Sequence, residues 1–473
     1  MEKLKEQIKK LKMEDILCLF VIICPILDML SFVFRNTFNS SISPSTFIRP
    51  IIPIILFIII FFKKNFKLQM IAVSAIYAIY AVIHLYLFNT VKAECSYGGL
   101  VSELQYIVNY TFLIVNLFLF TYLFWKKDND KLKKSVLIAF GIYVISLYVT
   151  IITGTSSTTY LEGTGYKGLY ESGNSLCTIL CISLCIILPM IKYKKYFWPV
   201  AILSVFAGIF LTMLVGTRTG LLGFGLIALL YILAECFTSL IGKIHINKKV
   251  IAISILALLL IILVAVMGGS KTLERRIHLK EVQASATDVE TGERRYLSGD
   301  VTELKHKIEN GEISEEYMPK EMQKAIIRLY NYAKQSNMQN NDMRKQQLMY
   351  NIYLVQEQKS MPLILFGNGY KAQFRELVME MEVPAFLCNF GIAGFILYFV
   401  PFLMIALYGL YIAIRNIRKI DTKYIMYLGG SWLAIFLSFL SGYTFFNSSS
   451  MVIVIAVNVV LINKILEIKE NKS

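Results

Sequence analysis

The chain has few charged residues and lacks the features of a soluble catalytic domain. Charged residues make up 17% of its 473 residues, hydrophobic residues make up 56%, and the mean hydropathy is +0.59. Soluble domains are about 25% charged and about 45–50% apolar, so the composition excludes that class. Phosphate-binding motifs of the ATPase type are absent. No connection expected on the cytoplasmic side is long enough to form a domain.

The cysteines do not form a disulfide framework. Seven of the eight lie in or beside apolar runs, and only Cys95 lies in a connection expected outside. Cys177, Cys181 and Cys185 share one helix face at i, i+4 and i+8. That spacing would suit binding of a soft metal ion, but no His or carboxylate is spaced to complete such a site. The alternative is that these cysteines pack as small apolar residues.

A dinucleotide-binding unit is also lacking. Residues 163–168 spell G-x-G-x-x-G, but they follow an apolar run. A dinucleotide site needs a preceding strand and a βαβ unit, so we interpret this stretch as a flexible outer loop.

The dominant feature that is present is a series of apolar runs. Roughly 20 apolar residues cross a bilayer, and twelve runs have or approach that length. They are 16–34, 47–62 (the marginal one), 68–88, 104–125, 135–153, 173–191, 197–215, 219–238, 250–267, 385–413, 424–442 and 446–463. The first run has no small-residue cleavage site, so we expect a retained helix. The sequence predicts an all-α polytopic membrane protein with three parts: 1–267 with nine spans, the large hydrophilic loop 268–383, and 384–473 with three spans and a tail.

The basic residues predict the sidedness. The net charge of +16 raises the alternative of a nucleic-acid partner. However, the two termini and the connections on the same side of the membrane as the N-terminus carry 26 of the 48 Lys and Arg. The large loop, in contrast, has 17 basic and 17 acidic residues. The positive-inside rule then places both termini in the cytoplasm and the large loop outside. We therefore expect a multi-pass cell-membrane protein in contact with the lipid bilayer, and no nucleic-acid partner.

The large loop is predicted to be mostly helical. Residues 319–335 place Met322, Ile326, Leu329, Tyr330 and Ala333 on one stripe. Residues 342–358 do the same with Leu348, Met349, Ile352 and Val355. Such stripes indicate packing on each other or on the bilayer surface. The stretch 281–300 has little periodicity and is expected to be irregular.

Charged residues inside membrane spans are costly and suggest function. We expect Asp28 to pair with a buried arginine such as Arg49, and Glu235 to extend to the membrane surface from the end of its helix. For His84, an interhelical hydrogen bond is the first interpretation and catalysis the alternative.

Arg218 lies in a very short turn between two apolar runs, Val215-Gly216-Thr217-Arg218-Thr219-Gly220. Helix N-termini favour anions, and a guanidinium offers two parallel donors to a phosphate. The sequence therefore predicts an anion site, with contact to lipid head groups as the alternative.

Tyrosines recur near the expected outer face. Tyr160, Tyr166 and Tyr170 flank the glycine-rich loop, and Tyr370 follows Gly367-Asn368-Gly369. Aromatic faces suit stacking on sugar rings, so Tyr166, Tyr170 and Tyr370 are candidates for contact with an acceptor sugar. The alternative for the first group is an interfacial aromatic belt.

With these features the chain resembles the O-antigen ligase and polysaccharide polymerase family of bacterial envelope proteins. The likeness covers about twelve spans, two inner termini and the outer loop between the ninth and tenth spans. Local motifs extend it: Thr217-Arg218-Thr219-Gly220, Arg344 followed by Leu365-Phe366-Gly367-Asn368-Gly369-Tyr370, Phe390-Gly391-Ile392-Ala393-Gly394, and Glu171-Ser172-Gly173-Asn174. A GT-C-like architecture is implied.

The resemblance implies an inverting glycan transfer on the outer face of the membrane. The donor would be an oligosaccharide on a polyprenyl diphosphate, and the acceptor another glycan. Arg218 and Arg344 would bind the leaving diphosphate in place of a metal, with Arg49, Asp28, Asn174 and Glu171 in supporting roles. The outer loop has no Asp-x-Asp pair, so we expect no cofactor and no metal ion. Other polysaccharide-assembly proteins are candidate partners.

One departure from the family concerns the residue that would accept a proton. Ligases of the family tend to carry His-Asn about eleven residues before the glycine pair, where this chain has Glu380-Met381-Glu382. That acidic pattern is similar to branches from bacteria that lack lipopolysaccharide. Glu380 or Glu382 is the candidate catalytic base, and hydrogen bonding to a sugar or pairing with loop arginines are the alternatives.

We therefore expect a membrane glycosyltransferase, and first a polymerase that extends a surface or capsular polysaccharide. A ligase that moves finished glycan to a wall or lipid acceptor differs only in the acceptor. A lipid-linked oligosaccharide flippase is the transporter alternative, but the large outer loop breaks the repeat symmetry that transporters usually show. A scaffold for polysaccharide assembly is the non-catalytic alternative.

Overall fold

The computed structural model describes most of the chain and divides it into two compact units. The described residues are 12–38, 43–63, 67–90, 99–127, 129–160, 163–241, 271, 274–275, 277, 301–316, 318, 320–335, 343–358, 360–370, 379–440 and 442–470. The bundle unit is Met1–Asn65, Phe112–Glu274 and Phe402–Ser473, and the loop unit is Phe66–Thr111 and Arg275–Pro401. These units follow internal contacts, so the division of the sequence at 268 and 383 stays a prediction.

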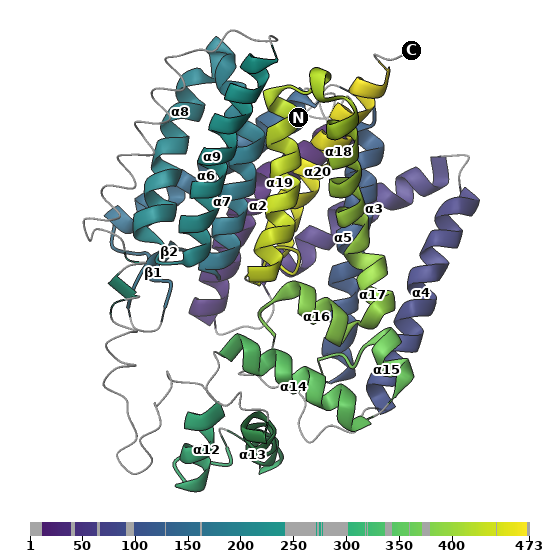
Figure 1. The fold of residues 1–473 in the computed structure, drawn as a ribbon, viewed down its shortest axis with the longest axis vertical. Coiled ribbons are helices and arrows are strands. Elements are labelled where there is room, and N and C mark those ends of the chain that lie inside the picture. The colour runs from purple at the N-terminus through teal and green to yellow at the C-terminus, as the bar shows by residue number, and fades with distance from the viewer. Residues whose placement is uncertain are drawn as a thin grey trace, which may run out of the picture. The chain divides into compact units, whose positions relative to one another are not determined.

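The bundle unit consists of long apolar helices and two five-residue helical segments, η1 and η2 (Figure 1). They are α2 (Met13–Phe38), α3 (Pro44–Lys63), α6 (Asp130–Ile152), α7 (Gly173–Ile187), η1 (Leu188–Lys192), α8 (Lys194–Ile209), η2 (Phe210–Leu214), α9 (Arg218–Leu240), α19 (Thr422–Leu440) and α20 (Ser448–Glu470). Helices α5 (Leu100–Phe124) and α18 (Val400–Arg415) contribute residues to both units. A short 3-10 helix, η5 (Ile417–Lys419), follows α18.

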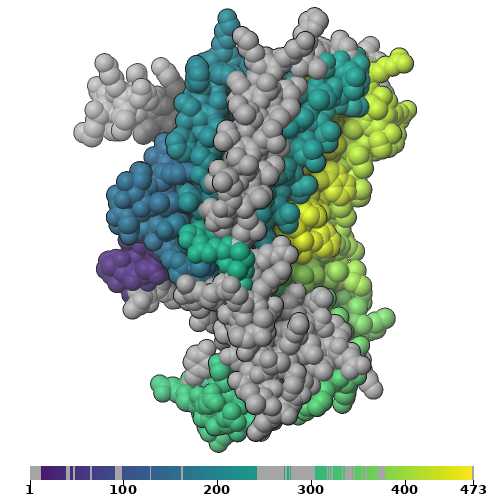
Figure 2. Space-filling model, turned by 60° about the vertical axis from the view of Figure 1, so that its left-hand side comes forward, coloured from purple at the N-terminus to yellow at the C-terminus, as the bar shows by residue number. Residues whose placement is uncertain are grey.

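Helix α7 lies at the centre of the bundle unit. It packs on α6, α9, α19 and α20, and apart from the half-buried Asn174 all its residues are buried. Ser172 caps its N-terminus, where the side-chain oxygen accepts a hydrogen bond from the Ser175 N–H. Segments distant in sequence therefore meet on this helix. Figure 2 shows the resulting proximity of teal residues from the middle of the chain to yellow residues near its C-terminus.

The three cysteines of α7 lie where neighbouring helices approach closely. A Cβ added at Gly220 would lie 3.0 Å from Cys177 Sγ, one at Gly223 would lie 2.7 Å from Cys181 Sγ, and one at Gly430 would lie 2.8 Å from Cys185 Cβ. Each cysteine thus packs against a glycine of α9 or α19, as small residues do in membrane helices. The packing interpretation explains the cysteines without a metal.

The glycine-rich stretch 163–168 closes a small hairpin. Strands β1 (Ser157–Thr158) and β2 (Tyr166–Gly168) pair antiparallel, with Thr158 opposite Tyr166. Gly163 and Gly165 have φ angles of +77° and +72°, which favour glycine. The sequence predicted a flexible loop here, but local backbone hydrogen bonds such as Thr159 N–H to Gly165 O (3.1 Å) order it.

The loop unit combines membrane-type and amphipathic helices. They are α4 (Lys67–Thr90), α12 (Val301–Glu309), α13 (Lys320–Gln335), α14 (Met343–Gln358), α15 (Met361–Phe366), α16 (Glu382–Asn389) and α17 (Gly391–Tyr398). The two helices predicted in the loop are confirmed as α13 and α14. The irregular stretch predicted for 281–300 lies outside the described residues.

The buried face predicted from the apolar stripe is observed for α13 but only in part for α14. Ile326, Leu329 and Tyr330 of α13 form a small core with Leu304, Met318 and Tyr350, as the stripe predicted. On α14, Ile352 is 41% exposed, whereas Gln347 and Asn351 are buried. The predicted face of α14 is therefore partly wrong. Its two amides are buried because they have hydrogen-bond partners: the Asn351 side chain donates to Gln347 O (2.9 Å), and Gln347 Oε1 accepts from Glu380 N–H (3.1 Å).

Most of the predicted spans appear as helices. Within the described residues, nine helices are long and apolar enough to cross a membrane, or ten if the bent pair α17 and α18 is one span. The run predicted as one span at 385–413 contains three helices, broken at Phe390-Gly391, where Gly391 has φ +68°, and before Val400-Pro401. The predicted span 250–267 and the connection with Cys95 lie outside the described residues.

Gly367→Ala should destabilise the protein. Gly367 has φ +85°, and an added Cβ would lie 2.1 Å from Asn389 O. We expect a loss of about 1–3 kcal/mol in unfolding free energy, seen as a lower thermal midpoint of the purified protein in detergent. The control is Gly99→Ala, because a Cβ there meets no atom within 4 Å. Equal midpoints for the two variants would contradict the position of this turn.

Candidate functional site

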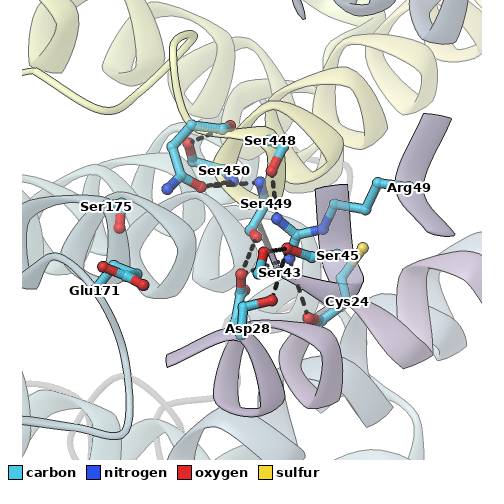
Figure 3. A network of polar contacts seen from close by, with 12 residues as sticks. Cys24, Asp28, Ser43, Ser45, Arg49, Glu171, Ser175, Ser448, Ser449 and Ser450 are labelled. Carbon is cyan, nitrogen blue, oxygen red and sulfur yellow. Dashed lines mark hydrogen bonds and ion pairs between the residues drawn. The ribbon is translucent and has the colours of Figure 1, made fainter. Parts of the chain in front are cut away.

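The bundle unit contains a buried ion pair between Asp28 of α2 and Arg49 of α3 (Figure 3). Their side chains are 17% and 7% exposed. Asp28 also accepts hydrogen bonds from Tyr143 Oη (2.7 Å) and Ser449 Oγ (2.6 Å), and Arg49 donates to Ser448 Oγ and to Cys24 O (3.4 Å). The pairing predicted from the sequence is confirmed.

This network joins four helices. Asp28 lies on α2, Arg49 on α3 and Tyr143 on α6, and the two serines begin α20. Ser45 extends the network by hydrogen bonds to Ser31 (2.6 Å) and Ser43 (3.0 Å). This buried ion pair is electrically neutral and is held by several hydrogen bonds, although the buried Arg49 Nε has no hydrogen-bond partner among the described residues. Such a network can position helices around a site but offers no free charge to a substrate.

Glu235 is a second buried carboxylate with a partner. It is 5% exposed, and its Oε1 lies 2.8 Å from Lys192 Nζ. The prediction that Glu235 extends to the membrane surface is therefore wrong, because the lysine comes to the carboxylate instead.

Arg218 has a different environment. It is the first residue of α9 and is exposed, and it forms no ion pair with any described residue. Thr217 caps the helix by accepting a hydrogen bond from the Gly220 N–H (3.1 Å), and Gly216 has φ +77°. The predicted hairpin is thus formed, with a guanidinium at a capped helix N-terminus, where anions are favoured.

The Arg218 turn packs against the glycine hairpin and the start of α7. A Cβ at Gly165 would lie 2.4 Å from Val215 O, and one at Gly173 would lie 3.4 Å from Thr217 Cγ2. Asn174 Oδ1 accepts a hydrogen bond of 3.4 Å from Thr219 Oγ1. The bundle unit therefore brings together Arg218, Asn174 and the hairpin that carries Tyr166.

Glu171 lies close to this region. Its carboxylate is 3.4 Å from Arg35 Nη1, and both side chains are nearly half exposed. Lys167 Nζ donates to the Glu171 carbonyl (3.1 Å), and burial lowers the pKa of Lys167. Glu171 and Ser175 lie beside the Asp28–Arg49 network in Figure 3.

The three predicted sugar-contacting tyrosines differ in exposure. Tyr170 is 4% exposed, donates to or accepts from Ser146 Oγ (2.6 Å), and packs near Tyr143. Tyr370 is also 4% exposed and stacks on Tyr106 with ring centroids 4.0 Å apart. Burial raises the pKa of both phenols. Only Tyr166, which is half-buried, keeps surface for a ligand.

The loop unit pairs two of the predicted site residues. Arg344 Nε on α14 donates to Glu380 Oε2 at 3.0 Å, and both side chains are more than 40% exposed. Gln347, one turn from Arg344, accepts from the Glu380 N–H. Helix α14 thus holds both the backbone and the carboxylate of Glu380.

The two acidic candidates have different environments. Glu380 is 48% exposed, whereas Glu382, the first residue of α16, is fully buried. A carboxylate in the first turn of a helix also interacts favourably with the helix dipole. Glu380 is therefore the member of the pair that a solvent-borne ligand can reach.

The two glycine motifs of the loop unit interlock. The Asn368 N–H donates to Cys388 O (3.2 Å) and the Gly369 N–H to Asn389 O (2.9 Å). A Cβ at Gly391 would lie 2.4 Å from Gly367 N. The Asn368 side-chain amide is 2% exposed and makes no hydrogen bond with a described residue.

Sequence reasoning missed Glu103, which pairs with His84. His84 Nε2 lies 2.8 Å from Glu103 Oε1, and Nδ1 lies 2.6 Å from Phe366 O. Glu103 Oε2 accepts from the Tyr370 N–H (2.9 Å), so the pair anchors the glycine turn. The hydrogen-bonding interpretation of His84 is confirmed. The signal for Glu103 was an acidic residue at the very edge of an apolar run.

The described site residues thus form two sets. Arg218, Asn174, Glu171, Asp28, Arg49, Tyr166 and Tyr170 belong to the bundle unit, and Arg344, Glu380, Glu382 and Tyr370 belong to the loop unit. That Arg218 and Arg344 share one anion stays a prediction.

Removing one partner of the buried pair should be costly. Arg49→Gln leaves Asp28 as an uncompensated buried charge, and we expect a loss of about 3–5 kcal/mol in unfolding free energy. The double variant Asp28→Asn/Arg49→Gln should be more stable than Arg49→Gln alone. Arg35→Gln, which breaks the exposed pair with Glu171, should cost less than about 1 kcal/mol. Chemical denaturation in detergent measures all three, and similar losses for Arg35→Gln and Arg49→Gln would contradict the burial of the network.

Comparison with known proteins identifies the family to which the chain belongs. Neither a curated protein nor a solved structure matches the chain. A family model described as "O-antigen ligase like membrane protein" matches residues 10–468. The match includes the Arg218 turn, the Arg344–Glu380 pair and the interlocked glycine motifs. The chain therefore belongs to the family of O-antigen ligase like membrane proteins.

Proposed function

We propose that the protein transfers glycan from a polyprenyl-diphosphate donor to a glycan acceptor on the outer face of the membrane, and so extends a surface polysaccharide. The family match over residues 10–468 is the observation that carries the proposal, because membership implies a membrane glycosyltransferase-type activity. The basic connections support an outer location of the site, since they favour a cytoplasmic position for the opposite ends of the spans.

The proposed step breaks the C1–O bond between the donor sugar and the diphosphate. The electron pair of that bond goes to the diphosphate oxygen, and the acceptor hydroxyl forms a new bond to C1 from the opposite face. Negative charge grows on the leaving group, so fixed cationic donors lower the barrier. Arg218 suits this role because it is exposed, has no ion-pair partner among the described residues and begins a capped helix. Arg344 is the second donor.

In this scheme Glu380 receives the proton of the acceptor hydroxyl. Arg344 Nε occupies one oxygen of Glu380 at 3.0 Å, and a carboxylate has a second oxygen with free lone pairs. The ion pair fixes the direction of the carboxylate before the acceptor arrives. Binding of the diphosphate by Arg344 would loosen this ion pair and free the Glu380 carboxylate for the acceptor hydroxyl when the donor is present.

Glu380→Gln should abolish transfer and leave donor binding nearly unchanged. The amide keeps the shape of the side chain but cannot accept the proton. Glu382→Gln, the matched control, changes a buried residue that a ligand in solvent does not reach, so its effect should fall mainly on stability. The measurements are the transfer rate and donor affinity of each purified variant. Retention of at least half of the rate by Glu380→Gln would remove the base role.

Arg218→Lys should impair transfer by tenfold or more. Lysine keeps the charge but cannot reproduce the two parallel donors of a guanidinium. The fold should be unaffected, since the exposed Arg218 side chain has no ion pair with any described residue to lose. Arg35→Lys is the control, because Arg35 is also exposed in the bundle unit. An unchanged transfer rate for Arg218→Lys, measured at saturating donor, would contradict the assignment.

The length of the product separates polymerase from ligase. A polymerase given one lipid-linked repeat unit as both donor and acceptor should produce a ladder of lipid-linked products. A ligase should leave the repeat unit uncombined until a different acceptor is added. Electrophoresis of the products measures this, and a single product formed only with the second acceptor would contradict the polymerase assignment.

A further inference from the structure

The bundle unit contains a cavity at the ends of its helices, remote in sequence from Arg218. Its volume is about 430 Å³. The lining comes from the turn after α5, the start of α6, Tyr193, α19 and the last turns of α20. These segments belong to the basic connections that the sequence predicts to be cytoplasmic. The cavity is therefore on the opposite membrane face from the proposed transfer site.

The lining is rich in lysine. Five of its residues are lysines and three are carboxylates: Lys126, Lys127, Lys133, Lys423 and Lys464 against Asp130, Glu467 and Glu470. Four of the lysines pair with carboxylates, which are Glu470 for Lys126, Glu14 for Lys127, Asp130 for Lys133 and Glu467 for Lys464. Lys423 is the exception, because its Nζ donates to the Tyr193 hydroxyl at 2.6 Å.

Tyr427 provides a second polar group at the cavity. It lies one turn after Lys423 on α19, lines the cavity and is 2% exposed. The hydroxyl is therefore a second possible donor at the wall of the cavity, beside the Lys423 ammonium. An oxygen acceptor in the cavity would accept a hydrogen bond from Tyr427 and pair with Lys423.

The wall of the cavity is held in a fixed shape. Asn463 of α20 accepts a hydrogen bond from the Lys126 N–H (3.0 Å) and donates to Phe124 O (2.7 Å) and Asn129 Oδ1 (2.9 Å). Lys126 has φ +53°, an uncommon angle for a residue other than glycine. Strained backbone of this kind persists where its surroundings fix it, and it concentrates at functional sites.

The position of the cavity identifies the source of the oxygen acceptor. Trp125 and Tyr193, beside the lining lysines, are 46% and 48% exposed, and exposed Trp and Tyr are typical of the lipid head-group level. Basic pockets between membrane helices on the cytoplasmic side bind phosphate-bearing head groups. A phosphodiester has oxygens for both the Lys423 ammonium and the Tyr427 hydroxyl.

We propose that this cavity binds the phosphate of an anionic glycerophospholipid of the cytoplasmic leaflet, with Lys423 and Tyr427 as its principal donors. The bound lipid stabilises the packing of α19 and α20 against the turn after α5. This site does not depend on the proposed transfer activity.

The test uses the full-length protein in detergent. Native mass spectrometry and the thermal midpoint are recorded with added phosphatidylglycerol, with phosphatidylcholine, and with inorganic phosphate alone. The variants are Tyr427→Phe, which keeps the ring, and Lys423→Gln/Tyr427→Phe. Lys194→Gln/Lys195→Gln is the control, since these two exposed lysines begin α8 and do not line the cavity.

We expect one phosphatidylglycerol to be retained and to raise the midpoint of the native protein and of the control. Its apparent affinity should fall at least tenfold in Lys423→Gln/Tyr427→Phe and measurably in Tyr427→Phe. Equal stabilisation by phosphatidylcholine, or unchanged affinity in the double variant, overturns the proposal. Stabilisation by inorganic phosphate with no further gain from the lipid assigns the cavity to a soluble phosphate and overturns the lipid as its source. If the double variant does not fold, the Tyr427→Phe affinity decides, and a value equal to that of the native protein overturns the proposal.

Discussion

A charge buried in a membrane bundle must have a partner, and this constraint organises the structure. Asp28 and Arg49 neutralise each other and connect four helices, Glu235 is matched by Lys192, and His84 by Glu103. Each pair links two different helices. Because desolvating an unpaired charge costs several kcal/mol, the pairs also restrict how the helices pack.

The same constraint distinguishes residues that hold the fold from residues that can act on a ligand. Asp28 and Arg49 are committed to each other, which makes them supports. Arg218, by contrast, is exposed at a helix N-terminus with no ion-pair partner among the described residues, and Glu380 is held by a single exposed ion pair. Gly367 and Gly391 allow two backbone segments to approach each other closely, because neither residue has a side chain. This close approach makes the turn that contains Asn368 compact.

The sequence predicted well whatever depends on long periodic signals. The runs from 16–34 to 219–238 appear as α2 to α9, and the apolar stripe of α13 forms the expected core. The Asp28–Arg49 pair was predictable because an intramembrane acid needs a base and few were available. The buried face of α14 was not predictable, because the amides of Gln347 and Asn351 are buried there. Asn351 donates a hydrogen bond to the Gln347 carbonyl, and Gln347 accepts one from the Glu380 N–H. Nor was the break in 385–413 predictable, because Gly391 adopts a left-handed angle inside an apolar run. The burial of Tyr170 and Tyr370 was not predictable either, because it depends on packing against Tyr143 and Tyr106, which lie elsewhere in the sequence.

The proposed reaction cleaves the bond between a glycan and a polyprenyl diphosphate and transfers the glycan to an acceptor. The most direct measurement reconstitutes the purified protein in liposomes with a polyprenyl-diphosphate-linked oligosaccharide and excess chelator. It then quantifies the free polyprenyl diphosphate and the new glycosidic bonds. Both products are expected to form in a one-to-one ratio without added divalent ions. Movement of intact donor across the bilayer with no polyprenyl diphosphate released would contradict this reaction and indicate a transporter.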